Sequence, residues 1–220
     1  MELKNLTVAF LGDSLTQGIG ASSPERSYPA VFSRNAKLKE GLNFGLGGTR
    51  IAKQKKSFRD ISEWDRDFIS RVDEIPADID CIVIMGGTND YMHGDAELGC
   101  SSDRDEYTFY GALHSLLSKV CKRFPSAKKV FMTPPHFVED VSPEHTHINK
   151  GHYFSEYLYA MKEVCGFYNI RVLDLHSLSG LDSKNEENKK EFYSDNVHLN
   201  DNGYKRIAER LEDYLRNINT

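Results

Sequence analysis

Short apolar segments rich in β-branched residues recur along the chain and predict five β-strands. Three of these segments, at residues 8–11, 81–85 and 130–132, are almost continuously apolar instead of alternating with polar residues. Continuous apolar runs are typical of strands that are buried on both faces of a parallel sheet. The five predicted strands cover residues 7–11, 42–46, 81–85, 129–133 and 170–175.

Between these strands, apolar residues recur at spacings of three and four, which predicts amphipathic helices. The clearest helical segments are residues 107–124, which Pro125 ends, residues 153–168, and residues 204–215, preceded by the capping sequence Asp201-Asn202. Strands that alternate with helices favour right-handed crossover connections. We therefore expect an α/β fold, a three-layer α/β/α sandwich, with ligands bound at the carboxyl ends of the strands.

The connections between these elements are of two kinds. Residues 94–105 and 134–152 are too long for simple turns, and loops of this length often act as lids or determine specificity. The charged run at residues 184–191 predicts a solvated turn. Neither a repeat nor a linker divides the chain, so we expect a single domain over residues 1–220.

Composition excludes several classes of function. The chain has 28 Lys and Arg against 33 Asp and Glu, a net charge of −5, which argues against nucleic-acid binding. No apolar run approaches the roughly 18 residues of a membrane span, and the apolar stretch before Gly12 is too short for a signal peptide. We expect a cytoplasmic protein without a membrane partner, or a secreted one if a leader has been lost. The four cysteines form no C-x-x-C pair, which predicts reduced thiols.

A serine follows the first predicted strand directly, in the sequence Gly12-Asp13-Ser14. Glycine permits a tight turn at the end of a buried strand, and such a turn can expose the Ser14 hydroxyl and backbone N–H. Ser14 is therefore a candidate nucleophile. The alternative is that Ser14 only caps the following helix.

A candidate base lies near the other end of the chain, where Asp195 and His198 stand three positions apart. At this spacing the aspartate can accept from His198 Nδ1–H, which leaves Nε2 to face a nucleophile. The alternative is an ion pair within a loop. Acyl transfer also needs donors for an oxyanion, and two strand ends supply them: the Gly48 backbone N–H and the Asn89 side-chain amide. Alternatively, these two residues only shape turns.

Taken together, these motifs resemble the SGNH hydrolases, also called the GDSL esterase/lipase family. Four blocks occur in family order: Gly12-Asp13-Ser14-Leu15, the glycine block ending at Gly48, Gly87-Thr88-Asn89-Asp90, and Asp195-Asn196-Val197-His198. The resemblance implies a flavodoxin-like sandwich with a five-stranded parallel sheet. It also implies that Ser14 is the nucleophile, that His198 is the base oriented by Asp195, and that Ser14, Gly48 and Asn89 form the oxyanion hole. Neither a metal nor an organic cofactor is implied.

The substrate is less well specified. We expect a small-molecule ester with a short acyl group, such as an O-acetyl group on a carbohydrate or metabolite. Acyltransferase, thioesterase and lysophospholipase activities on the same fold are alternatives, and the oligomeric state stays open, with a homo-oligomer among the candidates. The residues that follow or neighbour the catalytic strand ends are candidates for substrate binding: Asp13, Arg50, Tyr91, His93 and His136.

Two rival hypotheses concern other ligands. A histidine-rich loop could hold zinc, but its spacing matches no known zinc framework, so we expect no metal. Its candidate ligands are His136, His145, His147 and His152, with Glu139, Asp140 and Glu144 nearby. The glycines at residues 45–48 could instead suggest a nucleotide site, but they lack the G-x-G-x-x-G spacing.

Overall fold

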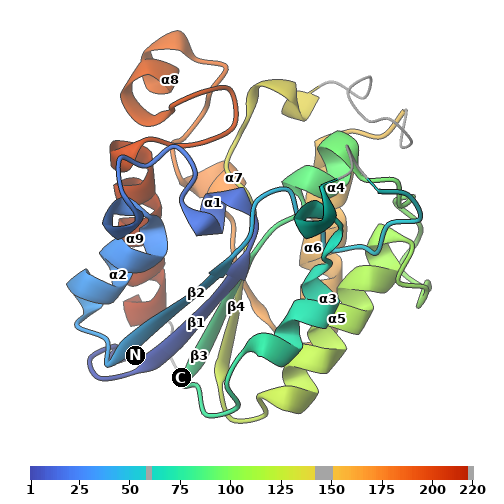
Figure 1. The fold of residues 1–220 in the computed structure, drawn as a ribbon, viewed down its shortest axis with the longest axis horizontal. Coiled ribbons are helices and arrows are strands. Elements are labelled where there is room, and N and C mark those ends of the chain that lie inside the picture. The colour runs from blue at the N-terminus through green and yellow to red at the C-terminus, as the bar shows by residue number, and fades with distance from the viewer. Residues whose placement is uncertain (58–60, 142–150, 218–220) are drawn as a thin grey trace.

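The computed structural model describes residues 1–57, 61–141 and 151–217. Its centre is a sheet of five parallel strands in the order β2-β1-β3-β4-β5 (Figure 1). The strands are β1 (Thr7–Gly12), β2 (Glu40–Gly45), β3 (Cys81–Met85), β4 (Lys128–Met132) and β5 (Arg171–Leu173). The predicted α/β fold with a five-stranded parallel sheet is confirmed.

Strands β1 and β3 lie inside the sheet and are buried along their whole length, as their continuous apolar sequences predict. The two edge strands differ from the prediction. β2 begins at Glu40 and is partly exposed, because it pairs only with β1. β5 ends at Leu173, because the next residue, Asp174, accepts a hydrogen bond from the backbone N–H of Ser177 and begins a helix.

Helices cover both faces of the sheet and complete the three layers (Figure 1). Side chains of β1 alternate between two cores: Val8 and Phe10 face α2 and α9, and Ala9 and Leu11 face the side of α3, α5 and α6. The α-helices are α1 (Ser14–Gln17), α2 (Tyr28–Ala36), α3 (Phe68–Arg71), α4 (Thr88–His93), α5 (Phe109–Arg123), α6 (Phe154–Phe167), α7 (Leu175–Leu178), α8 (Glu186–Phe192) and α9 (Asp201–Asn217). Short 3₁₀ turns are η1 (Pro24–Arg26), η2 (Ser62–Asp65), η3 (Val72–Glu74) and η4 (Val138–Val141).

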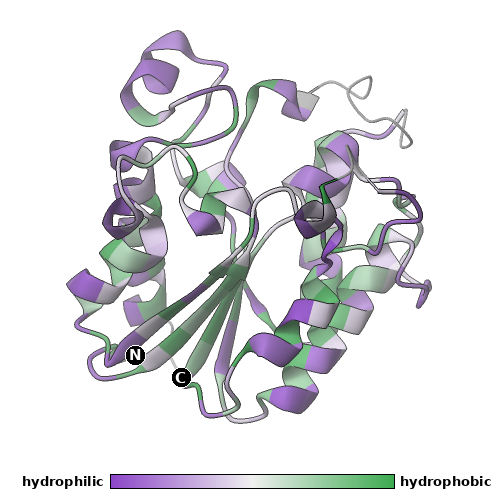
Figure 2. Cartoon of the chain, in the orientation of Figure 1, coloured by the Kyte–Doolittle hydropathy of each residue, from purple (hydrophilic) through white to green (hydrophobic). Residues whose placement is uncertain are grey.

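Hydropathy follows these layers, with apolar positions on the strands and on the inner faces of the helices (Figure 2). The helix predicted at residues 107–124 begins at Phe109, because the Thr108 side chain caps it by accepting from Gly111 N–H. The last helix begins three residues earlier than predicted, at Asp201. Within the described ranges, none of the helices is both long and apolar enough to cross a membrane.

The charged run at residues 184–191 was predicted as a solvated turn, and this prediction is wrong. Residues Glu186–Phe192 form α8, which Asn185 caps by accepting from the backbone N–H of Asn188. Its apolar end, Phe192, is buried, and the Arg206 guanidinium lies 4.6 Å from the centroid of the Phe192 ring. A cap and one buried aromatic side chain thus stabilise a helix whose other residues are mostly charged.

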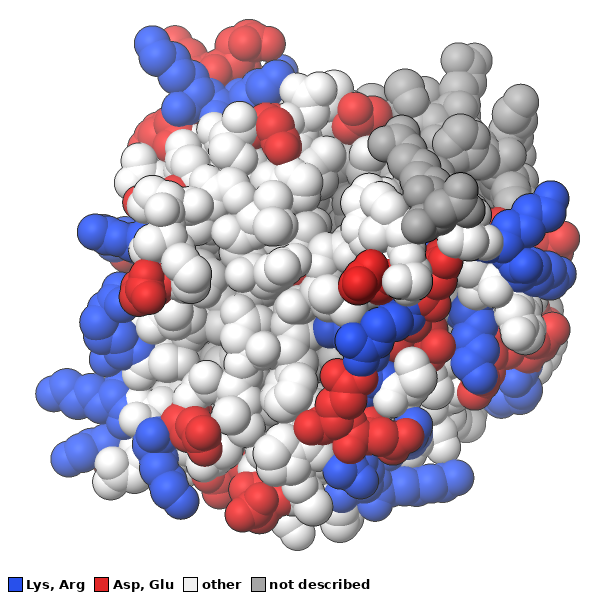
Figure 3. Space-filling model, in the orientation of Figure 1, with Lys and Arg blue, Asp and Glu red and all other residues white. Residues whose placement is uncertain are grey.

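On the face shown in Figure 3, a broad and largely uncharged area extends from the centre to the left, and charged side chains of both signs lie around it. The four cysteines are all free thiols, as predicted. The carboxyl ends of the strands meet at one edge of the sheet, and α1, α4 and α7 lie beside that edge (Figure 1). In a parallel α/β sheet this edge is where ligands bind.

Candidate active site

The turn from β1 into α1 places Ser14 at the edge of the sheet. Asp13 caps α1 by accepting from Leu15 N–H at 3.0 Å, and Ser14 is the first helical residue. The turn requires glycine at position 12, because a Cβ there would overlap the Thr16 side chain and lie 2.8 Å from the Met85 carbonyl oxygen. As the first residue of α1, Ser14 has a backbone N–H without a partner inside the helix.

The structure brings Ser14, His198 and Asp195 together, although 184 residues separate the first two. His198 Nε2 lies 3.0 Å from Ser14 Oγ, and His198 Nδ1 lies 2.7 Å from Asp195 Oδ2. Because a carboxylate only accepts, the proton between His198 and Asp195 belongs to Nδ1. Nε2 is therefore the unprotonated nitrogen that faces the Ser14 hydroxyl.

The loop that holds His198 is organised by Asp195. Its Oδ1 accepts from the backbone N–H groups of Val197 at 2.7 Å and His198 at 2.6 Å. Burial alone would raise the pKa of Asp195, but the hydrogen bonds from the His198 side chain and from these two backbone groups hold it below its usual value. Asp195 is thus an ionised acceptor that fixes both the backbone and the imidazole of His198.

The glycine loop after β2 passes beside Ser14. A Cβ placed on Gly47 would lie 3.6 Å from Ser14 Cβ, and Leu46 N–H donates to the Gly12 carbonyl at 3.1 Å. Gly48 has a φ of +74°, in the left-handed region that favours glycine, and a Cβ there would overlap the Trp64 ring. A side chain at position 48 is therefore excluded on two grounds.

Residues of α4 form hydrogen bonds with the end of the same loop. Asn89 Nδ2 donates to the Thr49 carbonyl at 3.0 Å, and the Asp90 carboxylate accepts from Ile51 and Ala52 N–H, both at 2.9 Å. Burial raises the pKa of Asp90 to about 6, although the two backbone N–H groups lower it. The second and third sequence blocks are thus joined by direct hydrogen bonds.

Three of the residues predicted to bind substrate have buried side chains with partners inside the protein, and their contact with substrate stays a prediction. Asp13 is 1% exposed and serves as the cap of α1. Arg50 is also 1% exposed and forms an ion pair with Asp65 at 2.9 Å. Tyr91 is fully buried in an aromatic cluster with Phe137, Phe154 and Tyr157.

His93 is half-buried and bonded on both ring nitrogens, to Asn89 Oδ1 at 3.0 Å and to Arg50 Nη1 at 3.2 Å. Its ring stacks on Trp64, with centroids 5.7 Å apart and an interplanar angle of 23°. Trp64 is not among the site residues that the sequence predicts. It is the single tryptophan of the chain and lies in no hydrophobic repeat, so only its contacts with Gly48 and His93 reveal its place in the site.

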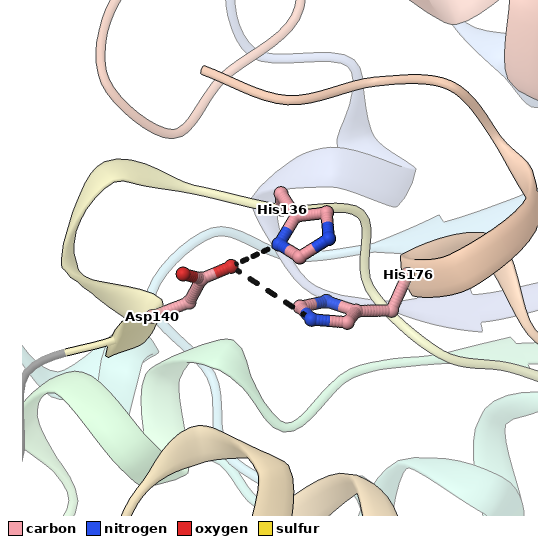
Figure 4. Close-up of side chains that lie close together, drawn as sticks. All are labelled: His136, Asp140 and His176. Carbon is pink, nitrogen blue, oxygen red and sulfur yellow. Dashed lines mark hydrogen bonds and ion pairs between the residues drawn. The ribbon is translucent and has the colours of Figure 1, made fainter. Parts of the chain in front are cut away.

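His136 belongs to a separate cluster with Asp140 and His176 (Figure 4). His136 Nδ1 lies 2.6 Å from Asp140 Oδ2, and His176 Nε2 lies 3.9 Å from the same oxygen. Burial lowers the pKa of His176 to about 4, so the imidazole is neutral near pH 7. His176 was not among the predicted metal ligands.

An ammonium group already lies against this cluster. Lys184 Nζ is 2.8 Å from Asp140 Oδ1 and 3.0 Å from His136 Nδ1, so it balances the carboxylate where a metal cation would bind. Of the other predicted metal ligands, His152 pairs with Glu156 at 2.9 Å, and Glu139 is not part of the cluster. His145, His147 and Glu144 lie outside the described residues.

Beside this cluster, the backbone of His136 and of η4 bonds to the loop that carries the candidate base. Val138 N–H donates to the Asn196 carbonyl at 3.1 Å, and the Tyr193 hydroxyl donates to the His136 carbonyl at 2.7 Å. These bonds hold positions 193 and 196, on either side of Asp195 and before His198. We interpret the cluster as a support for that loop.

A parallel sheet with a hydrogen-bonded serine, histidine and aspartate at its carboxyl edge defines a serine hydrolase of the α/β class. A model of the GDSL-like lipase/acylhydrolase family matches residues 10–206. The chain belongs to this family and is a serine ester hydrolase. The predicted family resemblance is confirmed.

Solved structures show the same fold. A protein from Lactobacillus plantarum is 27% identical, with a TM-score of 0.83 and both chains covered in full. A carbohydrate acetylesterase family member from Sinorhizobium meliloti is 19% identical, with a TM-score of 0.66 over 96% of this chain and 97% of that chain. A two-domain esterase active on acetylated mannans is 19% identical, with a TM-score of 0.59 over 97% of this chain and 50% of that chain. Among curated proteins, none matches the chain.

Proposed function

We propose that this protein removes short acyl groups, such as O-acetyl, from a carbohydrate or other small metabolite through an acyl-enzyme on Ser14. The observation that carries the proposal is the continuous hydrogen-bonded chain from Asp195 through His198 to Ser14, with distances of 2.7 and 3.0 Å. This chain lies beside the glycine loop and Asn89, which offer N–H donors. Nucleophile, base and oxyanion donors are the groups that acyl transfer requires.

In the proposed mechanism, the proton transfers follow a fixed order. His198 Nε2 accepts the Ser14 proton as Ser14 Oγ bonds to the ester carbonyl carbon. The carbonyl oxygen takes up the negative charge and accepts from Ser14 N–H, Gly48 N–H and the Asn89 amide. His198 then protonates the leaving alcohol, and the ester C–O bond breaks to give the acyl-enzyme. Water, deprotonated by His198, releases the acyl group in the same way.

Asp195 supports both halves of this cycle. When His198 carries two protons, its positive ring lies 2.7 Å from an ionised carboxylate. The low pKa of Asp195 keeps the proton on the imidazole instead of passing it to the carboxylate. The proton therefore returns to the leaving group.

Two observations favour a short acyl group on a carbohydrate. The helices that contain Ser14 and Asn89, α1 and α4, are four and six residues long, so within the described ranges neither provides an amphipathic lid for a long chain. Two proteins of the same fold are described as a carbohydrate acetylesterase family member and as an esterase active on acetylated mannans. Their chemistry supports testing acetylated sugars first.

The test is a panel of p-nitrophenyl esters of increasing acyl length, assayed beside acetylated sugars. We expect the highest kcat/KM for acetate and a decline with each added methylene pair. Ser14→Ala should lower kcat at least about a thousandfold, as removal of a nucleophile does in other triads. Turnover retained in purified Ser14→Ala would contradict the proposal. A rate that rises with added alcohol, with ester as product, would instead identify an acyltransferase.

A further inference from the structure

A chain of hydrogen bonds leads from Asp65 to the side chain of Asn89. Asp65 Oδ1 accepts from Arg50 Nη2 at 2.9 Å, and Arg50 Nη1 lies 3.2 Å from His93 Nδ1. His93 Nε2 lies 3.0 Å from Asn89 Oδ1. His93 and Asn89 are four residues apart on α4, so one helical turn brings their side chains together.

The chemistry of the groups fixes the direction of every bond. A guanidinium only donates, so His93 Nδ1 must accept from Arg50 and carries no proton. The neutral imidazole then has its proton on Nε2, which donates to Asn89 Oδ1. His93 is thereby held in a single tautomer by a residue outside the proposed reaction.

The tautomer of His93 in turn fixes the orientation of the Asn89 amide. With Oδ1 accepting from His93, Nδ2 is the atom that donates to the Thr49 carbonyl at 3.0 Å. A flipped amide would set Oδ1 against the Thr49 carbonyl oxygen and Nδ2–H against His93 Nε2–H, which loses two hydrogen bonds and creates two repulsions. Nδ2 has a second hydrogen, and no hydrogen bond among the described residues uses it.

We call this chain of hydrogen bonds from Asp65 to Asn89 the relay. Packing stabilises it as well. Arg50 is 1% exposed, so its ion pair with Asp65 is shielded on the arginine side. Trp64 stacks on His93 and lies over Gly48. One aromatic side chain therefore packs against the proposed Gly48 donor and against the histidine that bonds to Asn89. A change in the relay should therefore act on the oxyanion donors before it acts on Ser14 or His198.

We propose that His93, held by Arg50 and Asp65, is a positioning residue that keeps the free N–H of Asn89 directed at the substrate oxyanion. The proposal rests on the function proposed above and adds three residues to it. Its consequence is specific: loss of the His93 hydrogen bonds lowers kcat, because the oxyanion forms only during the reaction, and leaves KM nearly unchanged.

Two substitutions separate hydrogen bonding from packing. His93→Phe keeps an aromatic ring against Trp64 and removes both hydrogen bonds, so we expect kcat on p-nitrophenyl acetate to fall at least tenfold with KM within twofold. Loss of an entire oxyanion donor, about a hundredfold to a thousandfold, sets the upper limit. His93→Gln has an amide that both donates and accepts, so it should recover most of the rate. His152→Phe, at a surface histidine paired with Glu156, is the matched control and should retain full activity.

A second pair of variants keeps the test decisive if His93→Phe does not fold. His93→Glu can accept from Arg50 but has no proton for Asn89 Oδ1 at pH 8, so the Asn89 amide turns and its N–H faces the glutamate. We expect His93→Glu to lose as much kcat as Asn89→Ala, whereas the isosteric His93→Gln does not. Equal rates for His93→Glu and His93→Gln would overturn the proposal.

A double-mutant cycle distinguishes positioning from general damage. In the Asn89→Ala background, replacing His93 should have no further effect on kcat, because the group that it positions is gone. A full additional loss would show that His93 acts elsewhere and would overturn the relay. If Ser14→Ala and Asn89→Ala lose activity while His93→Phe keeps it, the relay is wrong and the proposed function stands. If Ser14→Ala and Asn89→Ala also keep their rates, the proposed function itself fails.

Discussion

At the scale of single residues, the two oxygens of Asp195 do different work. Oδ1 accepts from two backbone N–H groups and shapes the loop, while Oδ2 accepts from the His198 ring. An asparagine in this place can keep the first task through its own carbonyl oxygen. It cannot keep the second, because its amide NH₂ would donate toward Nδ1.

Asp195→Asn should therefore leave the loop folded and impair catalysis. Donation from the new amide makes His198 Nδ1 an acceptor and moves the ring proton to Nε2, which then cannot accept the proton of Ser14. We expect kcat to fall by about three powers of ten or more, with little change in thermal unfolding. Steady-state kinetics beside a melting curve measure both quantities. A loss of stability in step with the loss of rate would point to a structural role instead.

At the scale of elements, the glycine loop after β2 combines two constraints at one position. Gly48 has a φ of +74° and lies under the Trp64 ring, so an added methyl group both strains the backbone and displaces the indole. The strain is intrinsic to the residue type and costs about 1 kcal/mol or more. The displacement acts on the loop and on His93, which the same indole covers.

Gly48→Ala should accordingly reduce kcat at least tenfold and lower the free energy of unfolding. The matched control is Gly166→Ala in α6, where an added Cβ meets nothing within 4 Å and the backbone is helical. That control should retain full activity and gain up to about 1 kcal/mol of stability. Kinetics and chemical denaturation of both variants test the pair. Full activity in Gly48→Ala would argue against any role for this loop in catalysis.

The elements also show what the sequence could predict. The interior strands are continuous apolar runs because both faces are buried, and such runs are visible without a structure. The carboxyl end of β5 and the helix α8 depend on single caps, Asp174 and Asn185, whose effect is decided by the local backbone. The blocks with Ser14, Gly48, Asn89 and His198 were recognisable because each follows a strand or precedes a helix.

The surroundings of those blocks were not predictable in the same way. Arg50 and Tyr91 follow candidate strand ends, yet Arg50 is turned inward by Asp65 and His93, and Tyr91 by an aromatic cluster. Trp64 reaches the site from a 3₁₀ turn that no periodicity marks. A residue that follows a catalytic motif lies near the site, but the direction of its side chain depends on partners that are far away in sequence.

At the scale of the whole molecule, several buried and half-buried groups make folding depend on pH in opposite directions. Burial raises the pKa of Asp13 and of Asp90 to about 6, so each contributes stability that is lost as pH rises toward 6. Asp174, with its pKa lowered to about 2 by hydrogen bonds that outweigh burial, contributes stability that is lost only in strong acid. His176, with its pKa lowered to about 4 by burial, opposes the first two between pH 4 and 6.5.

One substitution isolates the contribution of a single group, Asp13, to this pH dependence. Asp13 Oδ2 is buried and has no hydrogen-bond partner among the described residues, while Oδ1 accepts from Leu15 N–H. Asp13→Asn can keep that cap and cannot ionise. Its stability relative to the natural chain should therefore increase from about pH 4 to pH 6 and stay constant above that. Two pKa units correspond to about 3 kcal/mol, which sets the scale of the gain at pH 8.

Urea unfolding of both proteins at pH 4, 6 and 8 measures this difference, because Asp13 is the one titrating group that the substitution removes. A gain from Asp13→Asn that is the same at pH 4 and pH 8 would mean that the Asp13 carboxylate is not the titrating group. The turn that positions Ser14 would then be held without the burial of a charge beside it. The pH dependence of folding would come from the remaining groups, Asp90, Asp174 and His176.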